Sequence, residues 1–460
     1  MAYTVDQSSG TGVQGAYDEI FYVVRDTVNY NAPKFRYLLR VTIDGAVVGT
    51  FKQLPNNNNS AVFLIEQIVA SYVHQDENVE QLGLLRPDGS LLTTKIFVTN
   101  QDAIKTVTVE FGYEKAADAN SAPVETMIAP LATTLKVING SLKNQTVDSN
   151  DTNAAGEFAL SNVNDSLLST TSKNYVSTGQ YGALAFLNGD DVGSDNCAYF
   201  HVTYYTAAGA AIVSGYFTND TAQGGKAPAA GLTDSNSLLY IGCFPGNLES
   251  QAIDTTIRPS NVSNWAYYEL QAASSTTLAG NQASQAYKFY NTCKTRYNDI
   301  LTPPNKFPGQ YCLSWWNNLG GVDNLIFDGA SKVIDQIKRE TFYSIGGNAF
   351  NAGNTVDYNK RPSEGGTTSS GNQTTTSIIL NTREHNPEML NELMQSLASS
   401  PRVYVYVIGS LQLPSVIGKS AAYVRCVVSD ISINYQTAIN DKISSYSVTI
   451  NISRRRPNNR

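Results

Sequence analysis

Paired carboxylates are the residues of this sequence that could carry out hydrolysis. Asp190 and Asp191 are adjacent, and Asp323 and Asp328 lie close to aromatic residues. A glycosidase needs two acids at a defined separation beside a sugar-binding platform. Adjacent acids in one turn usually solvate that turn, and a sequence cannot measure the distance between carboxylates. Cleavage of a polysaccharide is therefore the weaker hypothesis, and we predict no catalytic residues.

Two further motifs match binding sites only in part. Residues 10–15, GTGVQG, have the glycine spacing of a dinucleotide-binding turn, but no predicted strand precedes them and no predicted helix follows. Residues 148–157, DSNDTNAAGE, alternate oxygen ligands like a calcium loop, yet Asn153 replaces the glycine and Ala159 replaces the bidentate glutamate. A terminal arm and a polar turn are the better interpretations, so we predict no cofactor.

Residue types that bind metals are dispersed along the chain. His74, His201 and His385 show no HExxH spacing, and the five cysteines contain no CxxC pair. Scattered cysteines indicate free thiols in a protein made in a reducing cytoplasm. No signal peptide and no run of about 18 apolar residues is found, so we expect no membrane insertion. No metal site is predicted.

The composition favours β structure with a polar, weakly charged surface. Charged residues make up 15% of the chain, against about a quarter in typical globular proteins. The 27 tyrosines favour strands over long solvated helices. A net charge of −7 argues against a nucleic-acid partner, because such proteins normally carry a basic patch. We predict a mainly β protein of tandem β-sandwich-like domains with one or two short helices.

The first predicted unit spans residues 18–120, after a flexible N-terminal arm at 1–17. Residues 35–51 alternate apolar and polar side chains on either side of Asp44-Gly45, which is a strong hairpin signal. The period changes in residues 60–72, which predicts a short helix capped by Ser60. Residues 106–113 alternate again and predict a half-buried strand.

Two more units follow. Residues 121–295 begin with a loop-rich stretch up to about 173 and continue as strands separated by short polar turns, which predicts a β-sandwich. Residues 296–460 form a C-terminal β domain with a helix near 387–398, where Asn386 can cap and Pro387 fits the first position. Residues 365–377 are low in complexity and predict a mobile hairpin loop.

Trp315 and Trp316 are adjacent, so two large apolar side chains must be buried at one place in the C-terminal unit. If they lie in a strand they point to opposite faces, so one packs in the core and the other covers a partner domain or contacts another chain. Gly320-Gly321 allow positive φ at the turn that follows. Asp323 can accept hydrogen bonds from the turn amides. We interpret the segment as a packed corner and its tryptophans as candidate interface residues.

The C-terminus carries the only run of three cationic residues, Arg454, Arg455 and Arg456, followed by Arg460. Such an end is commonly a solvated tail. The alternative is that it docks onto an acidic neighbouring subunit. These three arginines complete the set of candidate interface residues.

The order of the segments resembles that of a protein family. The chain contains VFLIEQIVASYV at 62–73, YGALAFLNG at 181–189, YYTAAGAAI at 204–212 and WWNNLGGVDNLIF at 315–327, then MLNELMQSLASSPRVYVYV at 389–407 and DKISSYSVTINIS at 441–453. In this order it resembles tail-associated virion structural proteins of tailed bacteriophages, of baseplate or tail-tip type, especially those of Bacteroidetes-type hosts. The resemblance spans nearly the whole chain, and its motifs are architectural.

The resemblance implies a virion subunit made in the host cytoplasm, present in several copies around the tail axis. Its partners would be other copies of itself and other tail proteins. The sequence leaves two alternatives open: a receptor-binding adhesin that recognises a host surface glycan, and a polysaccharide-cleaving tail enzyme. The adhesin would place its aromatic residues on accessible loops, and the enzyme would bring two carboxylates together in a cleft.

Overall fold

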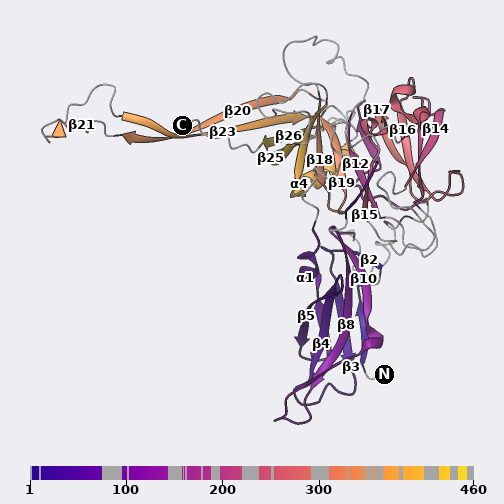
Figure 1. Ribbon diagram of the computed structural model, residues 1–460, viewed down its shortest axis with the longest axis vertical. Helices are drawn as coiled ribbons and strands as arrows, with labels where there is room; N and C mark the ends of the chain where they lie inside the picture. Colours follow the sequence, from indigo (N-terminus) through magenta and orange to yellow (C-terminus); the bar gives the residue numbers. More distant parts are fainter. Residues whose placement is uncertain are drawn as a thin grey trace.

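The protein is mainly β, as predicted. The computed structural model describes residues 3–9, 12–74, 96–100, 103–142, 158, 160, 163–177, 180–187, 197–219, 238–249, 253–291, 310–327, 329, 331–344, 349–350, 356–357, 366–382, 387–408, 424–435 and 444–452. Figure 1 shows N-terminal sheets at one end, middle and C-terminal sheets side by side at the other, and a long extension of the C-terminal sheet.

The N-terminal part is a sandwich of two sheets around a tyrosine-rich core. One sheet has the order β1 (Tyr3–Ser8), β3 (Phe21–Asp26), β6 (Ser60–Leu64). The other has the order β2 (Gly12–Gly15), β10 (Thr133–Ile138), β8 (Ile104–Lys115), β4 (Arg36–Ile43), β5 (Ala46–Gln53), with β9 (Val124–Met127) paired to β8. A short 3₁₀ helix, η1 (Ala129–Leu131), separates β9 from β10.

The predicted hairpin is confirmed, but two neighbouring expectations are wrong. β4 and β5 are joined by Asp44 and Gly45, both at positive φ, as a two-residue turn requires. Ser60 begins β6 instead of capping a helix, and α1 (Glu66–Ala70) starts after Ile65 without a side-chain cap. The N-terminal residues are not a flexible arm, because β1 pairs with β3 and β2 pairs with β10.

The middle part is a second sandwich with an aromatic core. One sheet runs β11 (Lys173–Val176), β17 (Tyr287–Asn291), β16 (Tyr267–Ala273), β13 (Tyr199–Tyr205), β14 (Ala211–Thr218). The other runs β12 (Ala183–Leu187), β15 (Leu238–Gly242), β7 (Phe97–Asn100). Short helical segments α2 (Pro245–Leu248), η3 (Thr255–Ile257) and η4 (Pro259–Asn261) follow β15. Phe97, Phe186 and Phe200 meet between the two sheets.

Strands cross between these parts. β7 precedes residue 120 in the sequence and pairs in the middle sandwich, whereas β10 follows residue 120 and pairs in the N-terminal sandwich. The domain boundaries near 120 and 295 stay predictions.

The C-terminal part is a seven-stranded sheet covered by one helix. Its order is β19 (Val322–Phe327), β18 (Gln310–Trp316), β24 (Val403–Ile408), β25 (Val424–Tyr435), β26 (Ser444–Ile452), β23 (Gly366–Asn381), β20 (Lys332–Ser344). The predicted helix is confirmed as α4 (Pro387–Ser399). Its apolar stripe is buried against the sheet, with Leu390, Leu393, Met394 and Leu397 in the core.

Two strands of this sheet continue beyond it as a long arm (Figure 1). β20 and β23 pair from Lys332↔Ile379 to Ser344↔Gly366. Among the described residues β26 pairs with β23 only between Thr376 and Asn381, so the remainder of the arm is a two-stranded ribbon. The low-complexity residues are therefore strand β23 and not a mobile loop. A small hairpin of β21 (Ala349–Phe350) and β22 (Val356–Asp357) follows β20.

No helix in the described part of the chain is both long and apolar enough to cross a membrane.

Candidate functional site

The two tryptophans lie at the end of β18 and point to opposite faces of the C-terminal sheet, as predicted. Trp315 is in the core beneath α4, and its Nε1 donates a hydrogen bond to Ser396 Oγ at 3.0 Å. Trp316 faces the middle sandwich, where its ring meets Tyr240 of β15 edge to face with centroids 5.6 Å apart. Successive side chains of a strand alternate between faces, which places one ring on each side.

Trp316 belongs to an apolar cluster that joins the three parts of the molecule. Its members come from the N-terminal part with the loop after β10, from the loop before β11, from β12 and β15 of the middle part, and from β18 and β19: Val13, Ala103, Ile138, Leu142, Leu168, Ala183, Ala185, Leu187, Leu238, Tyr240, Trp316 and Val322. Trp316 is only 4% exposed. Within one chain it therefore covers a neighbouring sheet, and its role as an anchor between chains stays a prediction.

Asp323 sits beside Trp315 in the β18–β19 ladder and is fully buried. Its carboxylate accepts hydrogen bonds from Ser169 Oγ at 3.0 Å, from the amide and hydroxyl of Thr170, and from Ser396 Oγ at 3.2 Å. Burial raises the pKa of Asp323 above its ordinary value, and the hydrogen bonds from Ser169 and Thr170 oppose the rise. The carboxylate thus ties the loop before β11 to α4.

The expectation that Asp323 accepts from the turn amides is wrong. Asn317 does this: its Oδ1 accepts from Leu319 N at 3.1 Å and Gly321 N at 2.8 Å. Its Nδ2 donates to the carbonyl of Leu168 at 2.9 Å. Asparagine fits because it offers an acceptor and a donor on one short side chain.

The glycine pair is needed for close approach as well as for the turn. Gly320 has φ +82, and a Cβ there would lie 2.5 Å from the carbonyl oxygen of Asn139. A Cβ on Gly321 would overlap the carbonyl oxygen of Leu168. The turn between β18 and β19 therefore packs directly against the backbones of the N-terminal and middle parts.

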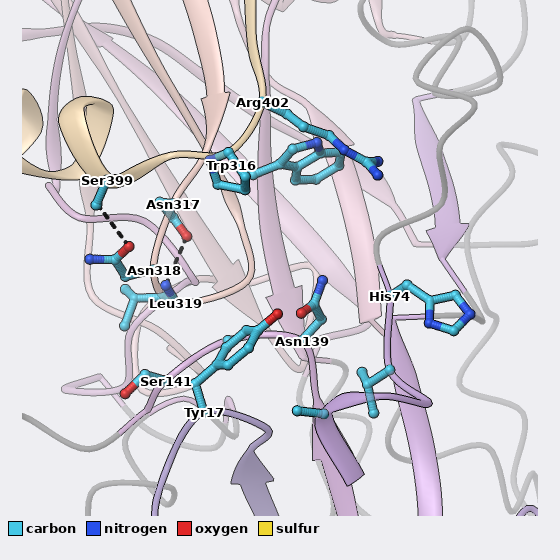
Figure 2. A pocket seen from close by; sticks show the side chains of 14 residues that line it. Tyr17, His74, Asn139, Ser141, Trp316, Asn317, Asn318, Leu319, Ser399 and Arg402 are labelled. Atoms are coloured by element: carbon cyan, nitrogen blue, oxygen red, sulfur yellow. Dashed lines mark hydrogen bonds between the residues drawn. The ribbon is translucent and has the colours of Figure 1, made fainter. Parts of the chain in front are cut away.

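A cavity of about 950 Å³ lies beside this turn (Figure 2). Its walls come from the N-terminal part, from the β18–β19 turn and from the segment after α4: Tyr17, Ala70, Val73, His74, Asn139, Gly140, Ser141, Trp316, Asn317, Asn318, Leu319, Ser399, Pro401 and Arg402. The Nε1 of Trp316 and the Oδ1 of Asn139 meet no hydrogen-bond partner among the described residues, and both atoms are buried. Arg402 is the one charged side chain among the described residues that line the cavity.

The other sequence candidates are not brought together here. Arg454, Arg455, Arg456, Asp190, Asp191, Asp328 and residues 148–157 lie outside the described residues, as does His385. His201 is buried in β13 and shares a hydrogen bond of 2.9 Å with the carbonyl of Ser275. In the described ranges no three His, Cys, Asp or Glu side chains gather in a way that could hold a metal ion.

Sequence reasoning missed the exposed aromatic residues of the arm. Phe342 is 50% exposed and Tyr343 is 69% exposed, near the end of β20. They are neighbours in one strand, so their rings lie on opposite faces of the ribbon. The available signal was the stretch KRETFYS at 338–344, in which three charged residues and one threonine precede two adjacent aromatic residues.

Comparisons with known proteins do not identify a family for this chain. No protein-family model matches the sequence, and no curated protein matches it. Among the solved structures that match is the tail of an empty GTA (gene transfer agent) particle with C6 symmetry, at 12% identity over 28% of this chain and 78% of that one, with a TM-score of 0.18. A TM-score this low carries no argument about this chain.

Proposed function

We propose that the protein is a structural subunit of a tailed-phage virion, associated with the tail or baseplate, that acts through contacts between several copies and with other tail proteins. The sequence resemblance suggests the virion. The arm of β20 and β23 is the observation that supports an assembly role, because it extends far from the body of its own chain (Figure 1).

A two-stranded ribbon is at best marginally stable by itself in water. This ribbon also presents an aromatic ring on each face, and Phe342 and Tyr343 face Thr368 and Thr367 across the strands. Exposed aromatic side chains that a fold does not cover are typical of protein interfaces. The arm is therefore best explained as a part that other subunits bury.

A catalytic role for Asp323, beside Trp315 and Trp316, has less support than an assembly role. Asp323 is buried and occupied by hydrogen bonds from two segments, so it does not face a cleft that a polysaccharide could enter. A glycosidase needs its acids on both sides of an accessible bond. We propose a role without catalysis, in which this residue holds the parts of the molecule together.

The test is the mass of the purified protein in solution, measured by light scattering with and without the other virion proteins. We expect a protein that is monomeric when dilute, associates weakly with itself as its concentration rises, and joins a defined ring when its partners are added. A variant that lacks residues 338–373, with an Asn-Gly turn joining the paired residues Ile337 and Thr374, should stay monomeric under the same conditions.

A variant with Phe342→Ser and Tyr343→Ser is the matched control, because it keeps the length of the arm and removes only the rings. Its assembly should fall between the wild type and the shortened variant. A stable trimer that binds host cells unaided would overturn the proposal in favour of an adhesin.

A further inference from the structure

The outer face of the N-terminal three-stranded sheet is apolar although nothing in its own chain covers it among the described residues. Phe21 pairs with Leu64, and Val23 pairs with Val62, across β3 and β6. Leu64 is 54% exposed and Val62 is 42% exposed, whereas Phe21 and Val23 are half-buried. These four residues form the β3–β6 face.

The opposite side of the same strands already faces the core. Tyr22, Val24, Ala61 and Phe63 alternate with the β3–β6 face and are buried. Strands that are apolar on both sides are typical of sheets that are covered on both sides. The pattern therefore indicates that the β3–β6 face is covered when the protein is assembled.

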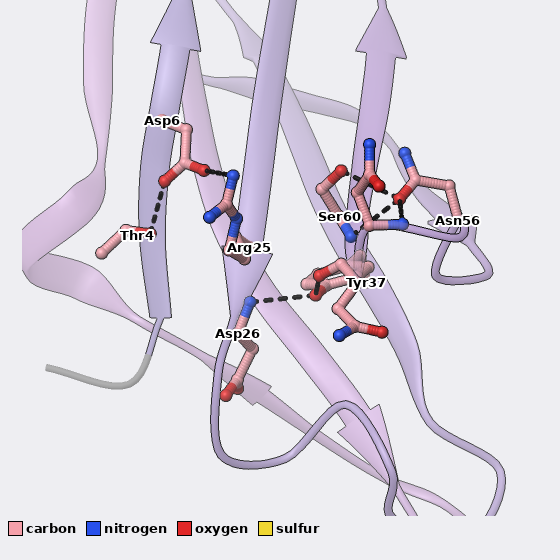
Figure 3. Close-up of polar contacts among 9 residues, drawn as sticks. Thr4, Asp6, Arg25, Asp26, Tyr37, Asn56 and Ser60 are labelled. Atoms are coloured by element: carbon pink, nitrogen blue, oxygen red, sulfur yellow. Dashed lines mark hydrogen bonds and ion pairs between the residues drawn. The ribbon is translucent and has the colours of Figure 1, made fainter.

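The β3–β6 face is acidic at one end. Glu19 precedes β3 and Glu66 follows β6, and Ile65 N donates to Ile20 O at 3.0 Å, so the two glutamates flank the same end of the strand pair. At the other end Asp6 pairs with Arg25 at 2.7 Å and accepts from Thr4 (Figure 3).

The arm has the complementary chemistry. Because side chains alternate along β20, Lys338 and Phe342 share one face of the ribbon, and Arg339 and Tyr343 share the other. All four side chains are exposed. Each face of the arm thus carries one cation and one aromatic ring, and the exposed Glu340 lies between Lys338 and Phe342 on the first of these faces. The β3–β6 face combines apolar side chains with acidic ones.

Acidic residues predominate in the part of the sequence that contains the β3–β6 face, and basic residues predominate in the part that contains the arm. Residues 1–291, up to the end of β17, contain 27 acidic and 15 basic residues, whereas residues 292–460 contain 12 acidic and 17 basic ones. Opposite net charges on two surfaces of one molecule favour head-to-tail contact between copies and disfavour contact between like surfaces.

We propose that the arm of one copy docks on the β3–β6 face of a second copy. One ring of the arm covers the four apolar side chains, and the cation on the same face of the arm pairs with Glu19 and Glu66. The arm runs away from the N-terminal sheets of its own chain, so the contact joins different copies (Figure 1). This inference rests on the proposed function, which requires several copies in contact.

Charge reversal tests the pairing. We expect that Lys338→Glu with Arg339→Glu weakens self-association about ten-fold or more, because like charges then face each other. Glu19→Lys with Glu66→Lys should do the same, and an equimolar mixture of the two variants should associate again. Glu392→Lys with Asp430→Lys makes the same change in net charge as the second variant, at exposed positions outside the proposed contact, and should associate like the wild type.

A disulfide cross-link gives a second measurement that does not depend on the charge variants folding. A Leu64→Cys protein is mixed with a Phe342→Cys protein under mild oxidation, and the linkage is identified by peptide mass mapping. We expect a bond between residues 64 and 342 of different copies, formed in the mixture and in neither protein alone. The four native cysteines of the described residues are buried, and Cys293, which lies outside them, is replaced by serine in both proteins.

The outcomes separate this inference from the proposed function. If the wild type assembles but the charge variants assemble equally well and no 64–342 bond forms, the docking site is wrong and the subunit role stands. If the wild type stays monomeric with every virion protein added, both fail.

Discussion

At the scale of single residues, the buried Asp323 accepts hydrogen bonds from two segments that are distant from it in sequence. It brings together two hydroxyls and an amide of the loop before β11, a hydroxyl of α4, and the strand that carries Trp315. A buried carboxylate costs stability unless such donors satisfy it. The network therefore fixes the position of α4 and of the neighbouring loop.

Replacing this carboxylate should change how stability depends on pH. Burial raises the pKa of Asp323 in the folded state, so the native protein binds this proton more tightly than the unfolded chain does. The stability that the group contributes is present below the unfolded pKa, about 3.9, and is lost as the pH rises through the folded pKa. Asp323→Asn removes this titration.

We expect the stability of the wild type relative to Asp323→Asn to increase as the pH falls from neutral towards about 4. The amide introduced by Asp323→Asn would turn a donor towards hydroxyl donors, which costs about 1–3 kcal/mol. Urea unfolding of both proteins at each pH measures the difference, and the other titrating groups cancel between them. A gap that is constant or shrinks on acidification would contradict the raised pKa.

At the scale of elements, the turn between β18 and β19 decides how the parts of the molecule meet. Gly320 needs its positive φ for the turn, and it also lies against the backbone of Asn139. Gly45, in the hairpin of β4 and β5, has nearly the same φ, +81, yet a Cβ added there would meet nothing within 4 Å. Comparing the two glycines separates backbone strain from close packing.

Gly45→Ala should cost about 1–2 kcal/mol of unfolding free energy, the penalty for an L-residue in the left-handed region. Gly320→Ala should cost the same strain plus about 1–3 kcal/mol for overpacking against Asn139. Denaturant unfolding monitored by tryptophan fluorescence measures both. Equal costs for the two variants would show that the approach of the two backbones is looser than the structure has it.

At the scale of the whole molecule, the acidic residues are concentrated in residues 1–291 and the basic excess in residues 292–460. The arm carries part of that excess away from the body, and the proposed contact brings it to the acidic end of another copy. Self-association should therefore weaken as salt is added, because exposed charges are screened within about 10 Å at 0.1 M ionic strength.

Sedimentation velocity at low salt and at about 0.5 M NaCl measures this dependence. The variant with Lys338→Glu and Arg339→Glu should respond less to salt, because its arm no longer attracts the acidic face. Association that is unchanged or stronger at high salt would assign the contact to apolar burial alone.

Much of the fold could be predicted because local periodicity follows burial. The β4–β5 hairpin, the strands on each side of the Trp corner and α4 all have apolar residues at the spacing of their element. The residues at 365–377 could not be predicted as a strand, because Gly, Ser and Thr there carry no apolar alternation. Their pairing comes from β20, a partner distant in sequence.

The sequence by itself determined the class of fold, the position of the long helix and the opposite orientation of Trp315 and Trp316, because these depend on residues close together in the chain. Tertiary structure alone decided that Asp323 bonds to Ser169, Thr170 and Ser396, that Gly320 lies against Asn139, and that the arm extends as a ribbon. Contacts between distant residues depend on how whole sheets pack, and no local pattern encodes that packing.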